Sequence, residues 1–192
     1  MPAGFSLLQP LATFFSSRIM TYVWLVLILV MGGFFRFTGV DWDEQQHLHP
    51  DERFVTMVTA GMSWPESFEN YFDPTTSALS PYADNTDVWY VYGTLPLYLT
   101  KWIAVTIDMD GYDKVYLVGR VLSGVMDLGC ILFLFLVGQR LYGDKTGLLA
   151  AALYALAVHP IQLSHFYAVD TFANFFVVMT FYWAIRASEK GN

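Results

Sequence analysis

Long apolar segments alternate with polar segments along the chain. The first covers residues 19–35, IMTYVWLVLILVMGGFF, an unbroken apolar run with an arginine on either side. Its length is close to the roughly 20 residues that cross a bilayer core. Apolar character returns at residues 115–137 and again in two shorter segments, 148–158 and 172–185. The pattern therefore predicts an all-α integral membrane protein with about four transmembrane helices.

The last two apolar segments are short for perpendicular spans. Either they extend into the connector between them, HPIQLSHFYAVD, or the membrane is locally thin. No small-x-small cleavage motif follows the first apolar run, which favours an uncleaved anchor over a signal peptide. We expect four regions along the chain: a cytoplasmic or interfacial N-terminus (1–18), a first transmembrane helix (19–36), an extracytoplasmic loop (37–113), and transmembrane helices two to four with a cytoplasmic tail (114–192).

The long loop contains two amphipathic segments. After Pro50, apolar residues recur at three- and four-residue intervals, as one face of a helix requires; they are Phe54, Met57, Val58, Gly61 and Met62. The second segment runs over residues 95–107 and is entered through WYVYG. We expect both helices to lie along the membrane surface with aromatic side chains near the lipid head groups, namely Tyr90, Tyr92, Tyr98 and Trp102.

Composition supports the membrane assignment and orients the chain. The 192 residues are 55% hydrophobic and 14% charged, with a net charge of -7, so the chain offers no basic face to nucleic acid. Residues 38–113 hold thirteen of the seventeen acidic residues but only two basic ones, Arg53 and Lys101. Loops that stay in the cytoplasm usually carry an excess of Lys and Arg. We therefore expect the loop outside the plasma (inner) membrane and both termini inside.

The polar run HLHPDERF, residues 47–54, allows two interpretations. Proline followed by two acidic residues is a common helix start, and composition alone favours this structural role. The functional alternative makes Asp51 or Glu52 a general base for a hydroxyl acceptor, because a carboxylate can take the proton as the acceptor oxygen attacks. Asp43 and Glu44 form a second carboxylate pair that suits the same role.

The two histidines of this run add a third alternative. His47 and His49 are interleaved with carboxylates, and such groups can bind a divalent metal, although His-x-His is a weak pattern. The sequence contains no Walker motif, no dinucleotide-binding glycine motif and no zinc pattern of cysteines. A divalent metal is thus the one cofactor that the sequence suggests.

Ionisable residues inside and beside the predicted spans form a separate group. Arg120, Ser123, Gly124 and Asp127 recur at helical intervals and so form one polar stripe. Ionisable residues at membrane depth are usually functional, but a buried ion pair or helix–helix packing, with Gly124 allowing close approach, is the preferred explanation for Asp127. Arg120 lies nearer the outer surface, where its guanidinium suits a phosphate. Asp170 begins the last helix, where it caps the helix, orients a sugar hydroxyl or helps to hold a metal.

Several of these landmarks occur in one order in a known superfamily. HPDERF, residues 49–54, resembles the HPDE signature of mannosyltransferases in the GT-C superfamily, membrane glycosyltransferases that use lipid-linked sugars. VYGTLPLYLTKW, VGRVLSGVMDL and YGDKTGLLAAALYALAVHPIQLSHFYAVDTFANFF look like the next landmarks of the protein O-mannosyltransferase-like, phospholipid-carrier-dependent branch. The resemblance covers residues 36–186 and includes the long outer loop after one transmembrane helix.

The resemblance implies an inverting transfer from a polyprenyl-phosphate-linked sugar to a hydroxyl or amine acceptor on the outer face. It makes Asp51 the catalytic base with Glu52 beside it, while Asp43 stays the alternative base. It puts Arg120 near the carrier phosphate and Asp170 near the acceptor or sugar. His49, the first residue of the signature, is a further candidate for substrate binding.

Members of this family usually continue through many more helices, whereas this sequence ends at Asn192. We therefore expect the N-terminal module of a longer enzyme, inactive as an isolated piece. The alternative, from a different functional class, is a non-catalytic accessory subunit of a larger membrane complex. In that role the same helices would pack against partner helices and lipids.

Overall fold

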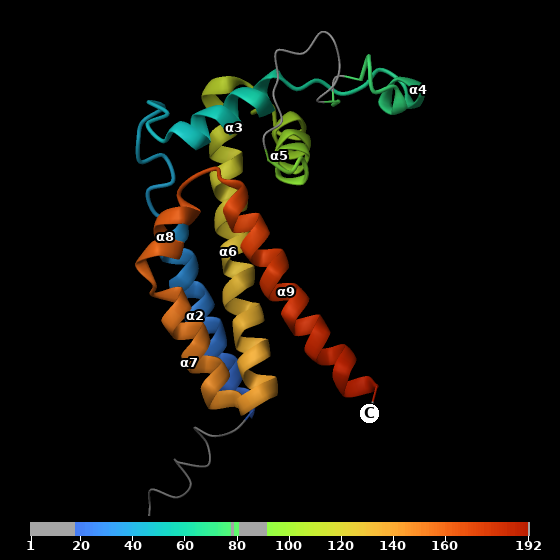
Figure 1. Cartoon of the computed structure of the whole chain (residues 1–192). Coiled ribbons are helices and arrows are strands. Elements are labelled where there is room, and N and C mark those ends of the chain that lie inside the picture. The colour runs from blue at the N-terminus through green and yellow to red at the C-terminus, as the bar shows by residue number, and fades with distance from the viewer. Residues whose placement is uncertain (1–17, 78, 81–91, 192) are drawn as a thin grey trace, which may run out of the picture. The chain divides into compact units, whose positions relative to one another are not determined.

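The computed structural model describes residues 18–77, 79–80 and 92–191, and all regular structure within them is helical, as predicted. Eight helices and no strand occur in this part of the chain (Figure 1). They are α2 (Arg18–Phe37), α3 (Pro50–Gly61), α4 (Phe68–Phe72), α5 (Leu95–Thr106), α6 (Tyr112–Tyr142), α7 (Asp144–Ala155), α8 (Val158–Ser164) and α9 (Val169–Lys190). The predictions for residues 1–17 and for Tyr90 lie outside the described residues.

Two of these helices, α2 and α6, are long and apolar enough to cross a membrane. α2 has 20 residues, which gives a length of about 30 Å and matches the hydrocarbon core of a bilayer. α6 has 31 residues and extends beyond the predicted span at both ends. α7 and α8 meet at a bend of 58° and pass the same test when taken together. The described residues thus contain two candidate spans, or three if the bent pair forms one, where four were predicted.

The chain folds into two compact units. Unit 1 comprises the described residues up to Phe35, Asp127–Ile161 and the described residues from Asn174 on. Its core comes from α2, α6 and α7 and consists of Leu25, Ile131, Phe135, Ala151 and Ala155. α6 and α7 approach each other closely, because a Cβ added to Gly138 would lie 2.9 Å from the Cα of Gly147. Glycine at these two positions therefore allows the two helices to pack backbone to backbone.

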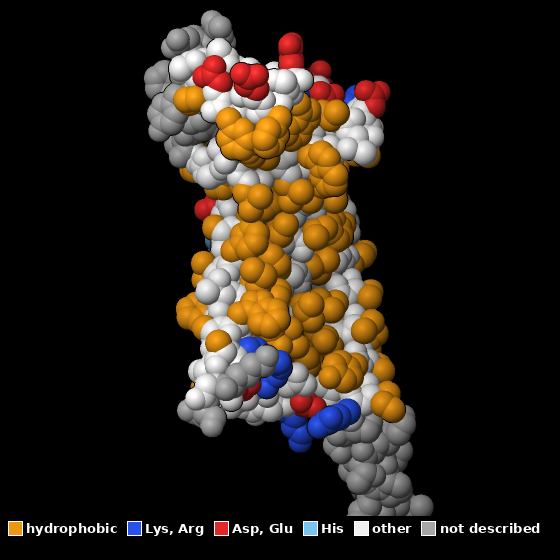
Figure 2. Space-filling model, turned by 90° about the vertical axis from the view of Figure 1, so that its right-hand side faces the viewer, with side chains coloured by type: hydrophobic (Ala, Val, Ile, Leu, Met, Phe, Trp, Pro, Cys, Tyr) orange, Lys and Arg blue, Asp and Glu red, His pale blue; other side chains and the backbone are white. Residues whose placement is uncertain are grey.

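The exterior of unit 1 is largely apolar. Only 17% of the apolar stretch of α2 is buried inside the protein, and large side chains of α9, such as Phe181 and Trp183, are exposed. Figure 2 shows hydrophobic side chains covering this unit as far as a group of Lys and Arg side chains at its end. An apolar exterior with charges at its end is what lipid-surrounded helices require.

Unit 2 comprises Arg36–Met126 and Gln162–Ala173. Both amphipathic helices predicted in the loop are present in it, as α3 and α5. These helices and the segment before α9 share a hydrophobic core, which consists of Val55, Val58, Met62, Leu79, Leu97 and Tyr167. The loop is therefore a packed structure, and its core also includes the segment before α9.

The buried face of α3 differs in part from the predicted one. Val58 and Met62 are buried as expected, but Met57 is 57% exposed. Thr59 is fully buried instead, and its hydroxyl forms a hydrogen bond of 2.9 Å with the Tyr167 hydroxyl. A pattern of apolar residues alone misplaces the face, because it leaves out a threonine that is buried with its hydroxyl hydrogen-bonded.

Candidate functional site

The candidate site begins at the first turn of α3. His49 is the N-cap residue, and its Nδ1 accepts a hydrogen bond from the backbone N–H of Glu52 at 3.3 Å. Pro50 occupies the first turn, followed by Asp51 and Glu52, as the helix-start interpretation predicted. The His49 ring also packs on Phe166, with 4.3 Å between ring centroids. The local sequence thus fixes the start of the helix and, with it, the directions in which the Asp51 and Glu52 side chains point from the first turn.

The two adjacent carboxylates have opposite environments. The Glu52 side chain is fully buried and receives two parallel hydrogen bonds of 2.7 Å from the Nε and Nη2 of Arg120. The backbone N–H of Tyr167 donates a third, also of 2.7 Å. Asp51 is exposed and has no hydrogen bond or ion pair with any residue in the described part of the chain. Glu52 is therefore an anchor, while the carboxylate of Asp51 is available to a substrate.

Arg120 is enclosed on every side. Besides Glu52, its guanidinium donates to the carbonyl oxygen of Val40 at 2.7 Å and lies 3.0 Å from Asp43 Oδ1. The rings of Tyr116 and Trp42 lie 4.6 Å and 5.4 Å from the guanidinium carbon, within the range of a cation–π interaction. The expected contact of Arg120 with a carrier phosphate stays a prediction, and it requires this side chain to leave its present partners.

The alternative pair of adjacent carboxylates, Asp43 and Glu44, likewise has one buried and one exposed member. Asp43 is fully buried beside Arg120, and its Oδ2 accepts the backbone N–H of Leu48 at 3.3 Å. Its neighbour Glu44 is exposed and has a left-handed φ of 47°. One buried guanidinium thus faces two buried carboxylates, and opposite charges this close are stable in a dry interior only as a group. Asp43 lacks the exposure that a base for an external acceptor needs.

The connector before α9 closes the site. Trp42 Nε1 donates to the carbonyl oxygen of His165 at 3.2 Å, and His165 Nε2 lies 2.9 Å from the carbonyl oxygen of Thr38. Tyr167 is fully buried, and this burial raises the pKa of its phenol to about 12. Tyr167 therefore stays neutral near pH 7, and its backbone N–H supports Glu52 while its hydroxyl pairs with Thr59. Asp170 lies exposed in the first turn of α9.

The two histidines of HLHPDERF have different neighbours. His47 is buried between the rings of Tyr112 and Tyr116, at centroid distances of 4.4 Å and 4.9 Å. Neither of its ring nitrogens has a hydrogen-bond partner among the described residues. Within residues 18–77, 79–80 and 92–191, no three His, Cys, Asp or Glu side chains come together as a metal site would require. The geometry therefore gives no support to the divalent metal suggested by His47 and His49.

The four residues of the predicted polar stripe on α6 are all buried. Arg120 and Ser123 are fully buried, and a Cβ on Gly124 would lie 2.7 Å from the Phe37 ring. Asp127 accepts a hydrogen bond of 2.7 Å from the Tyr154 hydroxyl. The packing interpretation therefore holds for Gly124 and Asp127.

Sequence reasoning missed the aromatic part of the site. Trp42, Tyr116 and Tyr167 enclose or support the Glu52–Arg120 pair, and Tyr116 also donates to Asp41 at 2.6 Å. Glu52 and Tyr167 are 115 residues apart in sequence. No local spacing connects residues so distant, and abundant aromatic residues do not stand out in an apolar chain.

Fold and site together define an all-helical membrane protein in which an exposed carboxylate sits beside a buried Arg–carboxylate group. Residues 97–192, half of the chain, match the family model described as dolichyl-phosphate-mannose-protein mannosyltransferase. The chain belongs to this family and carries a membrane glycosyltransferase domain. Membership implies a sugar donor linked to dolichyl or polyprenyl phosphate. No curated protein and no solved structure matches the chain.

The matched range covers only part of the site. Arg120, Tyr167 and Asp170 lie within it, whereas Asp51 and Glu52 precede it. The contacts of Glu52 with Arg120 and Tyr167 connect HPDERF to the matched region. The motif and the family match thus concern one site in unit 2.

Proposed function

We propose that this protein transfers a sugar from a polyprenyl-phosphate carrier to an acceptor hydroxyl on the extracytoplasmic face, with Asp51 as general base. The observation that carries the proposal is the opposite environment of two adjacent carboxylates: Glu52 is locked to Arg120, and Asp51 is exposed beside it. Family membership supports the class of donor. A carboxylate held at the rigid start of a helix is well suited to meet an acceptor in a fixed position.

In the proposed reaction the acceptor oxygen attacks the anomeric carbon from the side opposite the carrier phosphate. The bond from that carbon to the phosphate oxygen breaks, and polyprenyl phosphate leaves with the electron pair. The acceptor proton passes to the carboxylate of Asp51 as the new bond forms. One displacement of this kind inverts the anomeric configuration.

Other site residues have positioning or binding roles in this proposal. Glu52 and Arg120 hold the start of α3 in place, because their bidentate pair ties that turn to α6. His49 contributes through its cap on the same turn. His49 and the exposed Asp170 are proposed to contact the sugar or the acceptor, and Arg120 to lie near the carrier phosphate once bound substrate rearranges its partners.

The proposal includes an orientation in the plasma (inner) membrane. α9 has 22 residues, about 33 Å at 1.5 Å per residue, so it is long enough to be the fourth span beside α2, α6 and the α7–α8 pair. Basic residues occur in the turn 140–147 and near the end of the chain, whereas the loop is poor in them. This distribution favours a cytoplasmic position for the basic turn and an extracytoplasmic one for the loop.

The test compares Asp51→Asn with the unchanged protein in membrane vesicles supplied with a polyprenyl-phosphate sugar, using the full-length chain. General-base catalysis contributes roughly 10²- to 10⁴-fold, so we expect a loss of transfer in that range with unchanged thermal unfolding. Asp51→Glu keeps a carboxylate and should retain part of the rate. Glu66→Gln removes another exposed carboxylate of unit 2 and should leave the rate unchanged.

Two outcomes would overturn the assignment. If Asp51→Asn transfers at the original rate while folded Asp43→Asn does not, Asp43 is the base. If neither the unchanged protein nor its variants transfer sugar, but a stable complex with other membrane proteins is recovered, the accessory role replaces the enzymatic one.

A further inference from the structure

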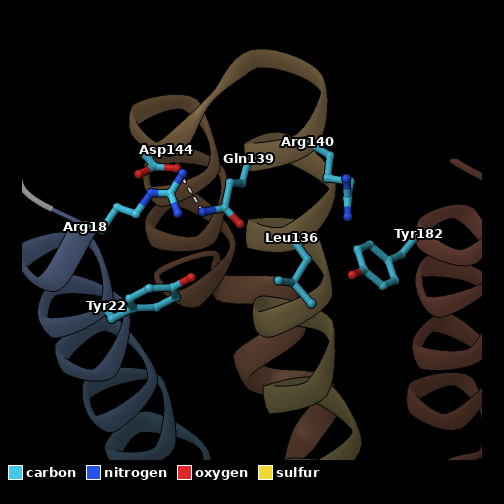
Figure 3. Close-up of a pocket in the computed structure, with 7 residues that line it drawn as sticks. All are labelled: Arg18, Tyr22, Leu136, Gln139, Arg140, Asp144 and Tyr182. Atoms are coloured by element: carbon cyan, nitrogen blue, oxygen red, sulfur yellow. Dashed lines mark hydrogen bonds between the residues drawn. The ribbon is translucent and has the colours of Figure 1, made fainter. Parts of the chain in front are cut away.

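A polar cavity occurs in unit 1, and none of its lining residues is used in the proposed reaction. It has a volume of about 410 Å³ and lies between α2, α6, α7 and α9 (Figure 3). The residues that line it, called here the basic pocket, are Arg18, Tyr22, Leu136, Gln139, Arg140, Asp144 and Tyr182. Six of the seven carry polar side chains, which is unusual beside helices whose other faces are apolar.

The charges of the basic pocket are unequal. Two arginines and one carboxylate line it. Asp144 already accepts hydrogen bonds from Gln139 Nε2 at 2.8 Å and from Thr21 Oγ1 at 3.1 Å, and Figure 3 shows the Arg18 guanidinium pointing toward it. The two arginines together offer more N–H donors than this one carboxylate can accept. The lining therefore has donors left for an anion.

Arg140 has a weak partner outside the pocket. Its Nη1 lies 2.8 Å from Glu189 Oε2, but the two side chains are 31% and 41% exposed. Ion pairs at such exposed positions contribute little, because water and salt screen them. An anion inside the cavity can thus replace Glu189 at low cost in free energy, since Arg140 lines the same cavity.

The position of the pocket suits a lipid head group. Arg18 begins α2 and Arg140 lies in the last turn of α6, the two helices that are long and apolar enough to span a membrane. Their charged ends therefore lie at the boundary of the hydrocarbon core, where phospholipid phosphates are found. Tyr22 and Tyr182 direct their hydroxyls into the space between the helices (Figure 3), as tyrosines at a membrane interface commonly do.

We propose that the basic pocket binds the phosphate of an anionic phospholipid head group. Arg18 and Arg140 make charge-assisted hydrogen bonds to the phosphate oxygens, and Tyr22 and Tyr182 donate their hydroxyls. The acyl chains lie along exposed apolar side chains of α2, such as Val26. This inference does not depend on the role of Asp51, because the pocket and that residue belong to different units.

The experiment places the full-length chain in phosphatidylcholine nanodiscs and adds increasing fractions of phosphatidylglycerol. Binding to the folded state should raise the unfolding temperature as the anionic lipid is added. In the double variant Arg18→Gln/Arg140→Gln, the apparent affinity should fall roughly 30-fold, the loss expected for two arginines at an anionic surface. Arg18→Lys/Arg140→Lys keeps both charges and should keep most of the affinity, which separates binding from a failure to fold.

A matched control removes two positive charges from the same unit outside the pocket, in Lys145→Gln/Arg186→Gln. This variant should respond to phosphatidylglycerol as the unchanged protein does. An equal loss in both double variants would mean unspecific attraction and would overturn the proposal, as would the absence of any response. Glycerol phosphate added to phosphatidylcholine discs tests a soluble ligand: if it gives the same arginine-dependent shift, a lipid is the wrong occupant.

Discussion

Unit 2 buries a group of charged side chains around one arginine, whereas unit 1 has two arginines and a carboxylate at the lining of a cavity. In unit 2, Arg120, Glu52 and Asp43 are fully enclosed and serve as partners for one another. In unit 1, Arg140 and Glu189 pair at the surface, and Arg18 is exposed. The same residue types thus occur in two settings, one closed by the protein itself and one open to a ligand.

Burial decides how easily each group of charged side chains can exchange its partners. A buried group that loses one member leaves an unpaired charge in a dry interior, so it fixes geometry and exchanges a partner only at a high cost in free energy. An exposed ion pair contributes little to the free energy of folding, so its arginine can release the carboxylate and bind an anion instead. Rigidity beneath Asp51 suits a site that must hold a base in one place, while open arginines suit a binding pocket.

The largest expected effect comes from breaking the closed group. Arg120→Met leaves Glu52 and Asp43 buried without a cation and should lower the free energy of unfolding by about 3 to 5 kcal/mol. Arg140→Met in unit 1 should cost about 0 to 1 kcal/mol, because its pair is exposed. Unfolding in mixed detergent micelles measures both. Adding Glu52→Gln to Arg120→Met should recover part of the loss; equal costs for the two arginines would contradict the comparison.

A smaller effect is expected from the packing that holds Tyr167 in place. A Cβ on Gly119 would lie 2.1 Å from Cγ of the Tyr167 ring, so Gly119→Ala forces the ring and its backbone aside. Overpacking of this kind costs about 1 to 3 kcal/mol, and the hydrogen bond from Tyr167 to Glu52 should weaken with it. The same unfolding assay checks this change.

Gly111→Ala is the control for this variant, because nothing lies within 4 Å of a Cβ at that position. It should change stability by no more than about 0.5 kcal/mol. If the two alanine variants are equally stable, the close packing of Tyr167 on α6 does not support the site.

The smallest effect is expected for an ion pair in which one side chain is buried and the other is exposed. Lys101 is buried and donates to Ala60 O at 3.2 Å and to Asp110 Oδ2 at 3.1 Å. The side-chain hydrogen bond from Lys101 lowers the pKa of Asp110 from its ordinary value of 3.8. Because the pKa of Asp110 is lower in the folded than in the unfolded state, its ionised carboxylate stabilises the fold. This stabilisation is complete above a pH of about 3.8, the ordinary pKa, and is lost as the pH falls through the pKa of Asp110 in the folded protein.

Unfolding temperatures measured from pH 6 down to pH 3 test this pair. Asp110→Asn should show a slightly smaller decrease on acidification than the unchanged protein, and the effect is small because the Asp110 side chain is 44% exposed. Glu66→Gln, which alters an exposed carboxylate with no such partner among the residues that the structure describes, should follow the unchanged protein. A parallel decrease for Asp110→Asn would show that Lys101 does not stabilise the fold through this contact.

Much of the fold could be predicted because its signals are local. The apolar run ending at Phe35 is long enough for a span wherever it lies, and Pro50 with two following acidic residues starts a helix by first-turn chemistry alone. The exposed Met57 is a residue for which local signals were insufficient. Which face of α3 becomes buried depends on the segments that pack against the helix. The prediction for Arg120 depended on depth in the membrane and did not foresee its enclosure between Trp42 and Tyr116.

The sequence by itself determined the helical membrane class, the acidic loop and the helix start at HPDERF, because hydrophobic period, composition and capping act over a few residues. Only the tertiary structure decided which of two adjacent carboxylates is buried. Asp51 and Glu52 are both carboxylates at the start of one helix, but of the two only Glu52 contacts Arg120, which is 68 residues from it in sequence. The free energy of a buried charge depends on its partner, so folding fixed Glu52 in the interior and left Asp51 at the surface.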